Sequence, residues 1–444
     1  MTTNNTYPSA GYAWYMVILL TVAYICSFTD RYVLGLLIEP IKAEMQLSDT
    51  QISLLLGPAF AIFYATMGLP LGWLADRKRR TWIVAAGIAV WSAATAASGL
   101  AKNFMHLFIA RMSVGVGEAT LSPCAMSMVS DSFPKEKRGK PIAFYSMSIG
   151  IGAAIASLFS GVVLKWAEGV TFINLPLVGD VAPWQFVFIT VGMPGLILAL
   201  LFFLLREPKR QQATETVDVG NANLLDTLKF IMERRVAFGS FLSIFCLMTI
   251  IAYSQGWLAA MFWRTWGWEA SKYALINGGI LLLVGPATVN LSGWYSDRLF
   301  NRDITDAPLR IAIVGAVIMI FSGIAAPLMP SAALAMFVYA INAIGISMTT
   351  ATGVTALLNI TPDKIRAQTV AFYYMVISLA GLLLGPTTVG ILTDQFFGEQ
   401  NMRYSMTMLP LIYGLPVLLL LPVIRRSYAK IYDEVQQQTV PPHA

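Results

Sequence analysis

Twelve apolar runs, each of about 20 residues or more, limit how this chain can fold. A membrane helix needs roughly 20 apolar residues, whereas a barrel strand needs about 10 that alternate in polarity. The runs are too long for such strands and do not alternate, so they predict an all-α membrane protein with twelve transmembrane helices. Only 12% of the residues are charged, against about 25% in a soluble domain. The runs lie near 14–38, 53–74, 81–100, 104–130, 140–165, 184–206, 236–263, 273–294, 309–329, 332–358, 368–394 and 404–426.

Lysine and arginine residues in the connecting loops predict the orientation of the chain in the membrane. Of the 30 basic residues, two lie inside spans and six lie in loops on one side. The remaining 22 lie on the other side, which should therefore face the cytoplasm together with both termini. This asymmetry also accounts for the net charge of +6 without a nucleic-acid partner.

Two motifs occur twice at almost the same spacing. GWLADR (72–77) recurs as GWYSDR (293–298), 221 residues later, just past the second span of each half. PKEKRGKPIAFY (134–145) is echoed by PDKIRAQTVAFY (362–373), 228 residues later. Two matches in register indicate two pseudo-symmetric six-helix bundles that arose by duplication.

This repeat predicts three parts of the chain. We expect an N-terminal six-helix bundle over 1–206, a cytoplasmic linker over 207–235 and a C-terminal six-helix bundle over 236–444. The linker is polar at first and ends in LLDTLKFIMERR (224–235), whose apolar residues recur at helical spacing. This last stretch predicts an amphipathic helix on the inner membrane surface, or else a plain helical connection.

Four charged residues lie deep within the apolar runs, all in the predicted first bundle: Asp30, Arg31, Arg111 and Glu118. Each would cost about 2.5–3.5 kcal/mol or more if it faced lipid, so they should face a watery cavity or one another. Glu118 should lie near the midplane, and Arg111, two turns away on the same helix face, about 10 Å further out. We therefore expect Glu118 to pair with Arg31, and Asp30 to pair with Arg111 or Arg31.

Acids and arginines paired at this depth favour proton coupling. A carboxyl group in a low dielectric favours its neutral form, and a nearby arginine favours the charged form. If an arginine moves away as the cavity changes sides, Asp30 or Glu118 would take up a proton and later release it. Arg31 and Arg111 would stay charged throughout. The alternative is a permanent cluster of ion pairs that fixes span one to span four.

The predicted second bundle has no charged residue in the middle of its spans. Its polar side chains are neutral, and the candidates for a cavity wall are Tyr253, Asn277, Tyr373 and Tyr374. A cavity that is charged on one wall and apolar on the other suits an amphiphile. The head group would lie beside Arg31 and Arg111, and the tail would lie along the second bundle. The alternative is that the charges serve coupling alone and the solute is neutral.

Charged residues near the predicted cytoplasmic loops are candidates for a gate that closes the inner side. The expected pairs are Asp76 with Arg77 and Arg80, Asp131 with Arg138, and Asp297 with Arg298. The alternative is that these charges only set the topology and contact lipid head groups.

Several motifs resemble those of the major facilitator superfamily. GWLADRKRR (72–80) resembles its loop signature between spans two and three, with Arg79 where glycine is usual. RMSVGVG (111–117) resembles its fourth-span Arg-Gly motif, and GLLLGPTTVG (381–390) is similar to its Gly-Pro gating motif. The resemblance covers nearly the whole chain. It implies the six-plus-six fold of that superfamily and a cavity that opens alternately to either side.

A narrower resemblance is to the Spinster family. TDRYVLG (29–35) in span one and VGVGEA (114–119) in span four are similar to the Asp-Arg and Gly-Glu-Ala motifs of that family. The resemblance implies a bacterial inner-membrane transporter of a lysolipid or sphingoid phosphate, coupled to protons. The organic-anion branch also carries Asp-Arg in span one, so a sugar acid or other small organic anion is the alternative substrate.

Other classes of protein fit the sequence less well. Three scattered cysteines and two histidines give neither a disulfide framework nor a metal site, and no Gly-Lys loop for phosphate is present. No nucleophile–base pair stands out, so we expect neither an enzyme nor a cofactor. Central charges argue against an open channel. We predict a monomeric secondary active transporter whose partners are an amphiphilic substrate, protons and membrane lipids.

Overall fold

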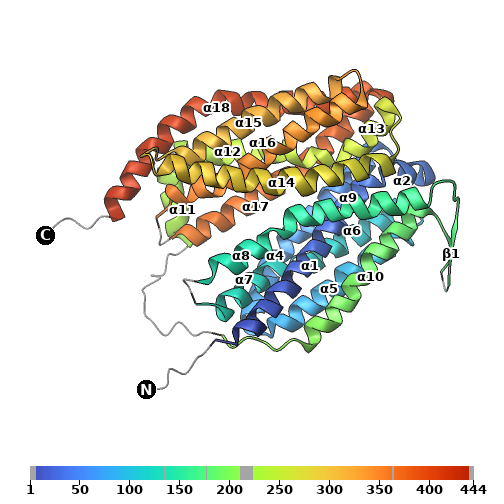
Figure 1. Cartoon of the computed structure of the whole chain (residues 1–444), viewed down its shortest axis with the longest axis horizontal. Helices are drawn as coiled ribbons and strands as arrows, with labels where there is room; N and C mark the ends of the chain where they lie inside the picture. Colours follow the sequence, from blue (N-terminus) through green and yellow to red (C-terminus); the bar gives the residue numbers. More distant parts are fainter. Residues whose placement is uncertain (1–6, 135–136, 177, 211–223, 363–364, 440–444) are drawn as a thin grey trace. The chain divides into compact units, whose positions relative to one another are not determined.

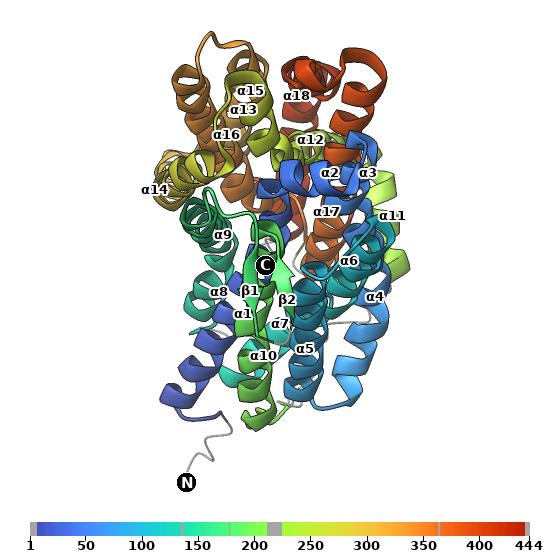
Figure 2. The same cartoon turned by 90° about the vertical axis from the view of Figure 1, so that its right-hand side faces the viewer.

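The computed structural model describes residues 7–134, 137–176, 178–210, 224–362 and 365–439, which are almost entirely helical (Figures 1 and 2). Within these ranges, eleven helical segments are long and apolar enough to cross a membrane. They correspond to eleven of the twelve predicted spans. The remaining one, the fourth, is divided into two shorter helices. The predicted all-α membrane fold is therefore confirmed, and the fourth span is the one without a helical segment of this length among the described residues.

The chain divides into two compact units, and the first contains Met1–Thr214 together with Gly256–Leu282. A small antiparallel hairpin, with Ile173 opposite Val181, joins α9 to α10. The elements of this unit are α1 (Ala10–Leu36), α2 (Ile38–Met45), α3 (Asp49–Leu56), α4 (Pro58–Arg77), α5 (Arg80–Ser98), α6 (Phe104–Glu118), α7 (Leu121–Ser132), α8 (Gly139–Ser146), α9 (Ser148–Trp166), β1 (Ile173–Leu175), β2 (Gly179–Val181), α10 (Pro183–Leu204) and α13 (Leu258–Trp266).

The second unit contains Glu215–Gln255 and Leu283–Ala444. The helix predicted at the end of the linker forms as α11, and its place on the membrane surface stays a prediction. Residues 211–223 of the predicted linker lie outside the described residues. Helix α14 (Ala270–Phe300) contributes to both units. The other elements are α11 (Leu224–Glu233), α12 (Arg235–Tyr253), α15 (Ala307–Ala325), η3 (Ala326–Leu328), α16 (Ala332–Asn359), α17 (Arg366–Leu392), η5 (Thr393–Phe397), η6 (Glu399–Asn401) and α18 (Met402–Thr439), and η2 (Ser254–Trp257) lies at the boundary between the units.

Local sequence signals explain where the helices around span two begin. Ser48 starts α3 with a capping box, because its hydroxyl accepts from the Gln51 N–H at 3.1 Å while the Gln51 side chain accepts from the Ser48 N–H at 3.0 Å. Pro58 then starts α4, where its missing N–H would have had no helical partner. Gly57 lies between the two helices and is not helical, so α3 ends before it and α4 begins after it.

The fourth span breaks directly after Glu118. Helix α6 ends there, and α7 begins three residues later at Leu121. The Thr120 hydroxyl donates to the carbonyl of Gly117 at 2.8 Å, and the Ala119 N–H reaches the carbonyls of Gly115 and Gly117. Such back-bonding by threonine next to glycine loosens a helix. The break places a buried carboxylate at the carboxyl end of a helix.

One backbone contact occurs in both halves of the chain. A Cβ added at Gly117 would lie 2.7 Å from the carbonyl oxygen of Gly87, so only glycine lets α6 approach α5 this closely. The same holds 228 residues later, where a Cβ at Gly345 would lie 2.7 Å from the carbonyl oxygen of Gly315. The spacing equals that of the second sequence repeat. The duplication is therefore preserved in the packing of α15 on α16.

Candidate functional site

Glu118 is the centre of the buried charges in the first unit. Its Oε2 atom lies 2.5 Å from Nη2 of Arg31 and accepts from Arg31 Nε at 2.6 Å. The hydroxyl of Ser27, one turn from Arg31 on α1, also donates to this atom at 2.7 Å. Because residues four apart share a helix face, Ser27 and Arg31 reach the same oxygen. The predicted pairing of Glu118 with Arg31 is present, and both belong to the same unit.

Asp30 has different surroundings from Glu118. It is 1% exposed, and its Oδ2 atom accepts from the hydroxyl of Thr95 on α5 at 3.1 Å. Arg111 donates to the backbone carbonyl of Asp30 at 3.3 Å and not to its carboxyl group. Neighbouring residues on a helix project about 100° apart, so Asp30 faces α5 while Arg31 faces Glu118. The expected side-chain pair between Asp30 and an arginine is therefore not formed in this conformation.

Three buried polar atoms of these residues have no hydrogen-bond partner among the described residues. They are Oδ1 of Asp30, Oε1 of Glu118 and Nε of Arg111. Buried polar atoms are normally satisfied, and each unsatisfied one calls for an explanation such as a water or ion. Either carboxyl group can therefore accept a proton, and Nε of Arg111 can still donate a hydrogen bond to a water or a ligand. We refer to Asp30, Arg31, Arg111 and Glu118 as the buried charge cluster.

Aromatic rings enclose the guanidinium of Arg31. Its carbon lies 4.9 Å from the ring centre of Phe28, 4.5 Å from that of Phe60 and 4.9 Å from that of Tyr64. The ring centre of Phe60 also lies 5.7 Å from the guanidinium carbon of Arg111. Rings at this distance stabilise a cation that has left water. Sequence reasoning missed these residues, although Phe60 and Tyr64 are four apart and so share one face of α4.

Among the predicted gate residues, Arg80 forms an extensive set of ion pairs and hydrogen bonds. It is 1% exposed, forms an ion pair with Asp131, and donates through Nε to Glu207 at 2.7 Å. It also donates to Ser127 and to the carbonyl of Pro208, at 2.7 and 3.0 Å. All these partners lie in the first unit. Arg80 therefore joins the start of α5, the end of α7 and the segment after α10.

The other gate residues form different contacts from those expected. Arg138 donates to the backbone carbonyls of Phe133 and Ser130, and Asp131 pairs with Arg80. Asp76, Arg77, Asp297 and Arg298 are all exposed. The two arginines of the repeated motif stack on tryptophans one turn earlier, Arg77 on Trp73 at 4.0 Å and Arg298 on Trp294 at 5.4 Å. The role of these residues in a gate stays a prediction.

The four predicted cavity-wall residues do not form one group within either unit. Asn277 belongs to the first unit, where it donates to Ser157 at 3.3 Å. Tyr373 is buried among Phe241 and Phe245 in the second unit, whereas its neighbour Tyr374 is 48% exposed. Tyr253 packs against α17 at Gly381 and Gly385.

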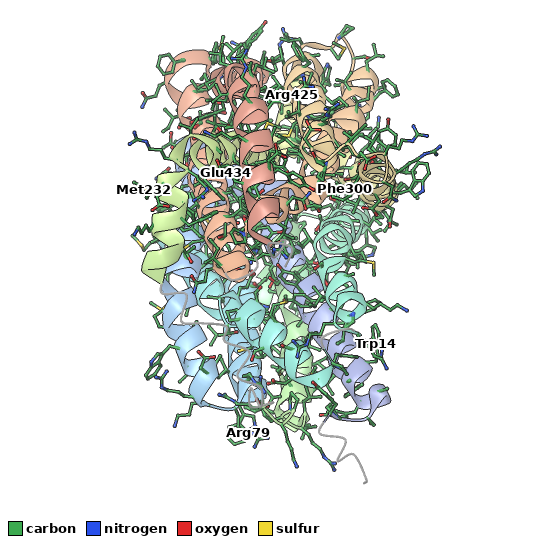
Figure 3. The ribbon with its side chains drawn as sticks, turned by 90° about the vertical axis from the view of Figure 1, so that its left-hand side faces the viewer. Trp14, Arg79, Met232, Phe300, Arg425 and Glu434 are labelled. Atoms are coloured by element: carbon green, nitrogen blue, oxygen red, sulfur yellow. The ribbon has the colours of Figure 1, made fainter. Side chains whose placement is uncertain are left out.

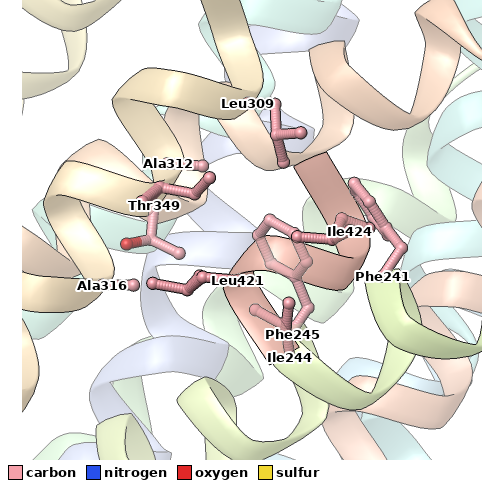
Figure 4. Close-up of a pocket in the computed structure, with 10 residues that line it drawn as sticks. Phe241, Ile244, Phe245, Leu309, Ala312, Ala316, Thr349, Leu421 and Ile424 are labelled. Carbon is pink, nitrogen blue, oxygen red and sulfur yellow. The ribbon is translucent and has the colours of Figure 1, made fainter. Parts of the chain in front are cut away.

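The second unit also contains a small apolar hollow (Figure 4). Thr349 is the one polar residue among those that line it. No charged residue lines this hollow. The lining residues are Phe241, Ile244, Phe245, Leu309, Ala312, Ile313, Ala316, Thr349, Leu421 and Ile424.

A second charged group lies at the opposite end of α1 from the N-terminus. Arg264 on α13 forms ion pairs with Asp49 on α3 and Glu39 on α2, both at 2.7 Å. Lys42 on α2 binds the same Asp49 carboxylate at 2.7 Å. We call these four residues the Arg264 cluster. Sequence reasoning placed Arg264 and Lys42 only as loop charges, and no motif indicated that they meet.

A membrane bundle with a duplicated six-span pattern and charges buried inside one copy is the architecture of a membrane transport protein. The chain belongs to the Major Facilitator Superfamily, whose family model matches residues 20–341. Known members of this superfamily that resemble the chain are transporters and not enzymes.

Curated relatives that resemble the chain carry different names. The chain is 27% identical over 388 residues to an MFS-type efflux pump of Mycolicibacterium smegmatis, covering 86% of this chain and 85% of that protein. It is 27% identical over 305 residues to the "Probable L-galactonate transporter" of Escherichia coli, covering 66% and 63%. It is 25% identical over 409 residues to human protein spinster homolog 1, covering 87% and 74%.

Among solved structures, the chain resembles the crystal structure of a bacterial homolog to the human lysosomal transporter Spinster, in an inward-facing and unoccupied conformation. The two align with a TM-score of 0.80 and 26% identity, covering 98% of this chain and 100% of that chain. The predicted major facilitator fold and the predicted resemblance to Spinster proteins are therefore confirmed.

Proposed function

We propose that this protein is a proton-coupled secondary active transporter of a lipid-like amphiphile, of the lysolipid or sphingoid-phosphate type. It acts as a monomer in the bacterial inner membrane, with both termini in the cytoplasm. Asp30 and Glu118 carry the protons, Arg31 and Arg111 hold the head group, and the two halves give access to each side in turn. Similarity to Spinster proteins supports the class of substrate.

The contrast between the two buried carboxyl groups carries this proposal. The carboxyl group of Glu118 forms an ion pair with Arg31. Asp30 is equally buried. Within the described residues its carboxyl group accepts one hydrogen bond, from Thr95, and forms no ion pair. A buried charge without a partner is costly, and a carboxyl group avoids this cost by holding a proton. We therefore assign proton uptake and release first to Asp30, whose carboxyl group has no ion pair among the described residues, while Glu118 is held by Arg31.

Arg111 explains how the proton could be exchanged for substrate. It is 2% exposed and forms no ion pair within the described residues. Arginine cannot lose its charge in a protein. A negatively charged head group, or the ionised form of Asp30, would supply the missing partner. The neutral second bundle would then face the apolar tail.

Proton movement in liposomes that contain the purified protein tests the coupling. Asp30→Asn and Glu118→Gln should each abolish the pH change that accompanies substrate movement, because each removes a proton site. Asp303→Asn is the control, since Asp303 is exposed and lies in a left-handed conformation that asparagine tolerates. Full coupling in both buried-site variants would refute the proposal.

A small organic anion, such as a sugar acid, is the second candidate substrate. Similarity to the L-galactonate transporter favours it, as do two arginines in the buried charge cluster. The decisive experiment is a binding screen on the purified protein at two pH values, comparing lysolipids, sphingoid phosphates and short organic anions. Binding of the short anions alone would replace the amphiphile as the proposed substrate.

A further inference from the structure

The outer part of the seventh span packs with the first unit, although the sequence repeat assigns it to the second half. Helix α12 ends at Tyr253, the short 3-10 helix η2 follows, and α13 begins at Leu258. The division between the two compact units falls inside η2, between Gln255 and Gly256. A break in helical geometry therefore coincides with the point where the chain changes units.

The Arg264 cluster holds α13 against α2 and α3. Arg264 has 6% of its side chain exposed, and its Nη1 and Nη2 atoms donate to the two oxygens of Asp49 at 2.7 and 2.8 Å. Its Nε atom donates to Glu39 at 2.7 Å. The Asp49 side chain is fully buried and also receives a bond from Lys42. A forked guanidinium on a buried carboxylate is among the strongest polar contacts in proteins, and losing one partner leaves the other buried and charged.

A second contact brings the start of this segment close to α1. A Cβ added at Gly35 would lie 2.7 Å from the carbonyl oxygen of Gly256. Gly35 therefore allows the two backbones to touch at the η2 end of this segment, while the ion pairs hold α13 at Arg264. The buried residues of α13 are all apolar: Leu258, Ala259, Ala260, Met261 and Phe262.

We propose that Arg264 is a positioning residue of the transport cycle, which latches α13 onto the first unit and closes the face that the loop charges predict to be external. Opening of this face requires Arg264 to leave Asp49 and Glu39 while α13 turns about Ser254–Gly256. Asp49, Glu39 and Lys42 then remain on the first unit. The proposal rests on alternating access but not on any particular substrate.

Labelling of a single cysteine from outside the cell tests the latch. The reporter is Ala259→Cys, which is 5% exposed on α13, in a background without Cys26, Cys124 and Cys246. A membrane-impermeant maleimide should label it slowly in the otherwise unchanged protein. Adding Arg264→Gln should speed labelling by about tenfold or more, since a broken buried pair outweighs the energy of one decade in an equilibrium.

Further variants separate release of the latch from misfolding. Arg264→Lys keeps one charge contact and should give an intermediate rate. Glu39→Gln removes only the partly exposed arm of the cluster and should give a smaller increase than Arg264→Gln. Lys272→Gln is the matched control, because Lys272 is an exposed cation that stacks on Trp268. Thermal unfolding of each purified variant reports whether it has folded.

Two outcomes would overturn the latch. One is equal labelling of the reporter in folded Arg264→Gln, Glu39→Gln and Lys272→Gln proteins. The other is fast labelling of the reporter alone, which would show that α13 is not held in the first place. The assay needs no substrate, so a wrong assignment of the amphiphile would leave its result unchanged.

Discussion

The arginines of the first unit occupy three kinds of surroundings. Arg79 is exposed (Figure 3). Its guanidinium carbon lies 4.6 Å from the ring centre of Trp82. Its neighbour Arg80 is buried and bonded to two carboxylates. Arg31 lies between these extremes, with an ion pair on one side and three rings around it. These settings predict that the first contributes little to stability, the second stabilises the fold, and the third is able to change partners.

The pair of neighbours Arg79 and Arg80 gives a direct test. Arg80→Gln should destabilise the protein by about 3 kcal/mol, because it leaves Asp131 and Glu207 without their cation. Arg79→Gln should change stability by no more than ~0.5 kcal/mol, as for most surface substitutions. Thermal unfolding in detergent measures both. Similar melting temperatures for the two variants would show that the Arg80 contacts contribute nothing to the folded state.

Glu39 makes the stability depend on pH. Burial raises the pKa of Glu39 above its ordinary value of 4.5, although Arg264 and Lys42 oppose this effect. Just above pH 4.5 the folded protein therefore binds more protons than the unfolded chain, and this contribution to stability falls as pH rises through the folded-state pKa. Glu39→Gln should flatten this part of a plot of melting temperature against pH. Glu269→Gln, at an exposed position, is the control and should leave the slope unchanged.

The sequence predicts the depth of each charged residue in the membrane, but depth alone predicted only one of the pairings within the buried charge cluster. Glu118 and Arg31 lie at similar depth on spans one and four, and they meet. Asp30 and Arg111 also lie at compatible depths, but the direction of each side chain depends on the rotation of its helix, which a single apolar run does not determine. The sequence predicted a pair of Asp131 with Arg138, whereas the packing of the helices brings Arg80 to Asp131.

At the scale of the element, the fourth span shows what a count of apolar residues cannot detect. Its composition predicts one helix over 104–130, whereas the structure contains α6 and α7. The signal for the break is local: Gly115, Gly117 and Thr120 lie within six residues and weaken the helical hydrogen bonds. At this break the carbonyl of Gly117 accepts from both the N–H and the hydroxyl of Thr120, in place of the regular helical bonding of an unbroken span.

The contact between α5 and α6 predicts a strong effect of one methyl group. Gly117→Ala should push the two helices apart and cost about 1–3 kcal/mol, because the Cβ would meet backbone atoms that cannot rotate away. Gly345→Ala should do the same in the second unit. Gly239→Ala is the control, since nothing lies within 4 Å of an added Cβ there. Melting temperatures of the three proteins check this, and a milder effect of Gly117→Ala than of Gly239→Ala would contradict it.

On the scale of the whole molecule, the sequence repeat and the compact units divide the chain differently. The repeat places the start of the second bundle at residue 236, whereas Gly256–Leu282 belongs to the first unit. The sequence repeat reflects the duplication of a six-helix unit, whereas the compact units reflect which residues are in contact in this conformation. The difference depends on pairs distant in sequence, such as Arg264 with Asp49, so no local pattern could have revealed it.

The orientation predicted from loop charges can be checked with two cysteines. Lys137 and Val178 are exposed and lie in loops on opposite sides of the predicted membrane. Val178→Cys should react with an impermeant maleimide in intact cells, and Lys137→Cys should react only after the cells are opened. Both belong in a background without the three native cysteines. The reverse pattern would place both termini outside.

The glycine contact that occurs in both copies also bears on how the two copies evolved. The contact of Gly87 with Gly117 and that of Gly315 with Gly345 share the same spacing, whereas the buried charged side chains of the described residues lie in the first copy. We infer that this helix packing dates from before the duplication, whereas the buried charges belong to one copy. Substitutions among the buried charges of one copy can therefore change the preferred substrate during evolution, while the packing of the helices stays the same.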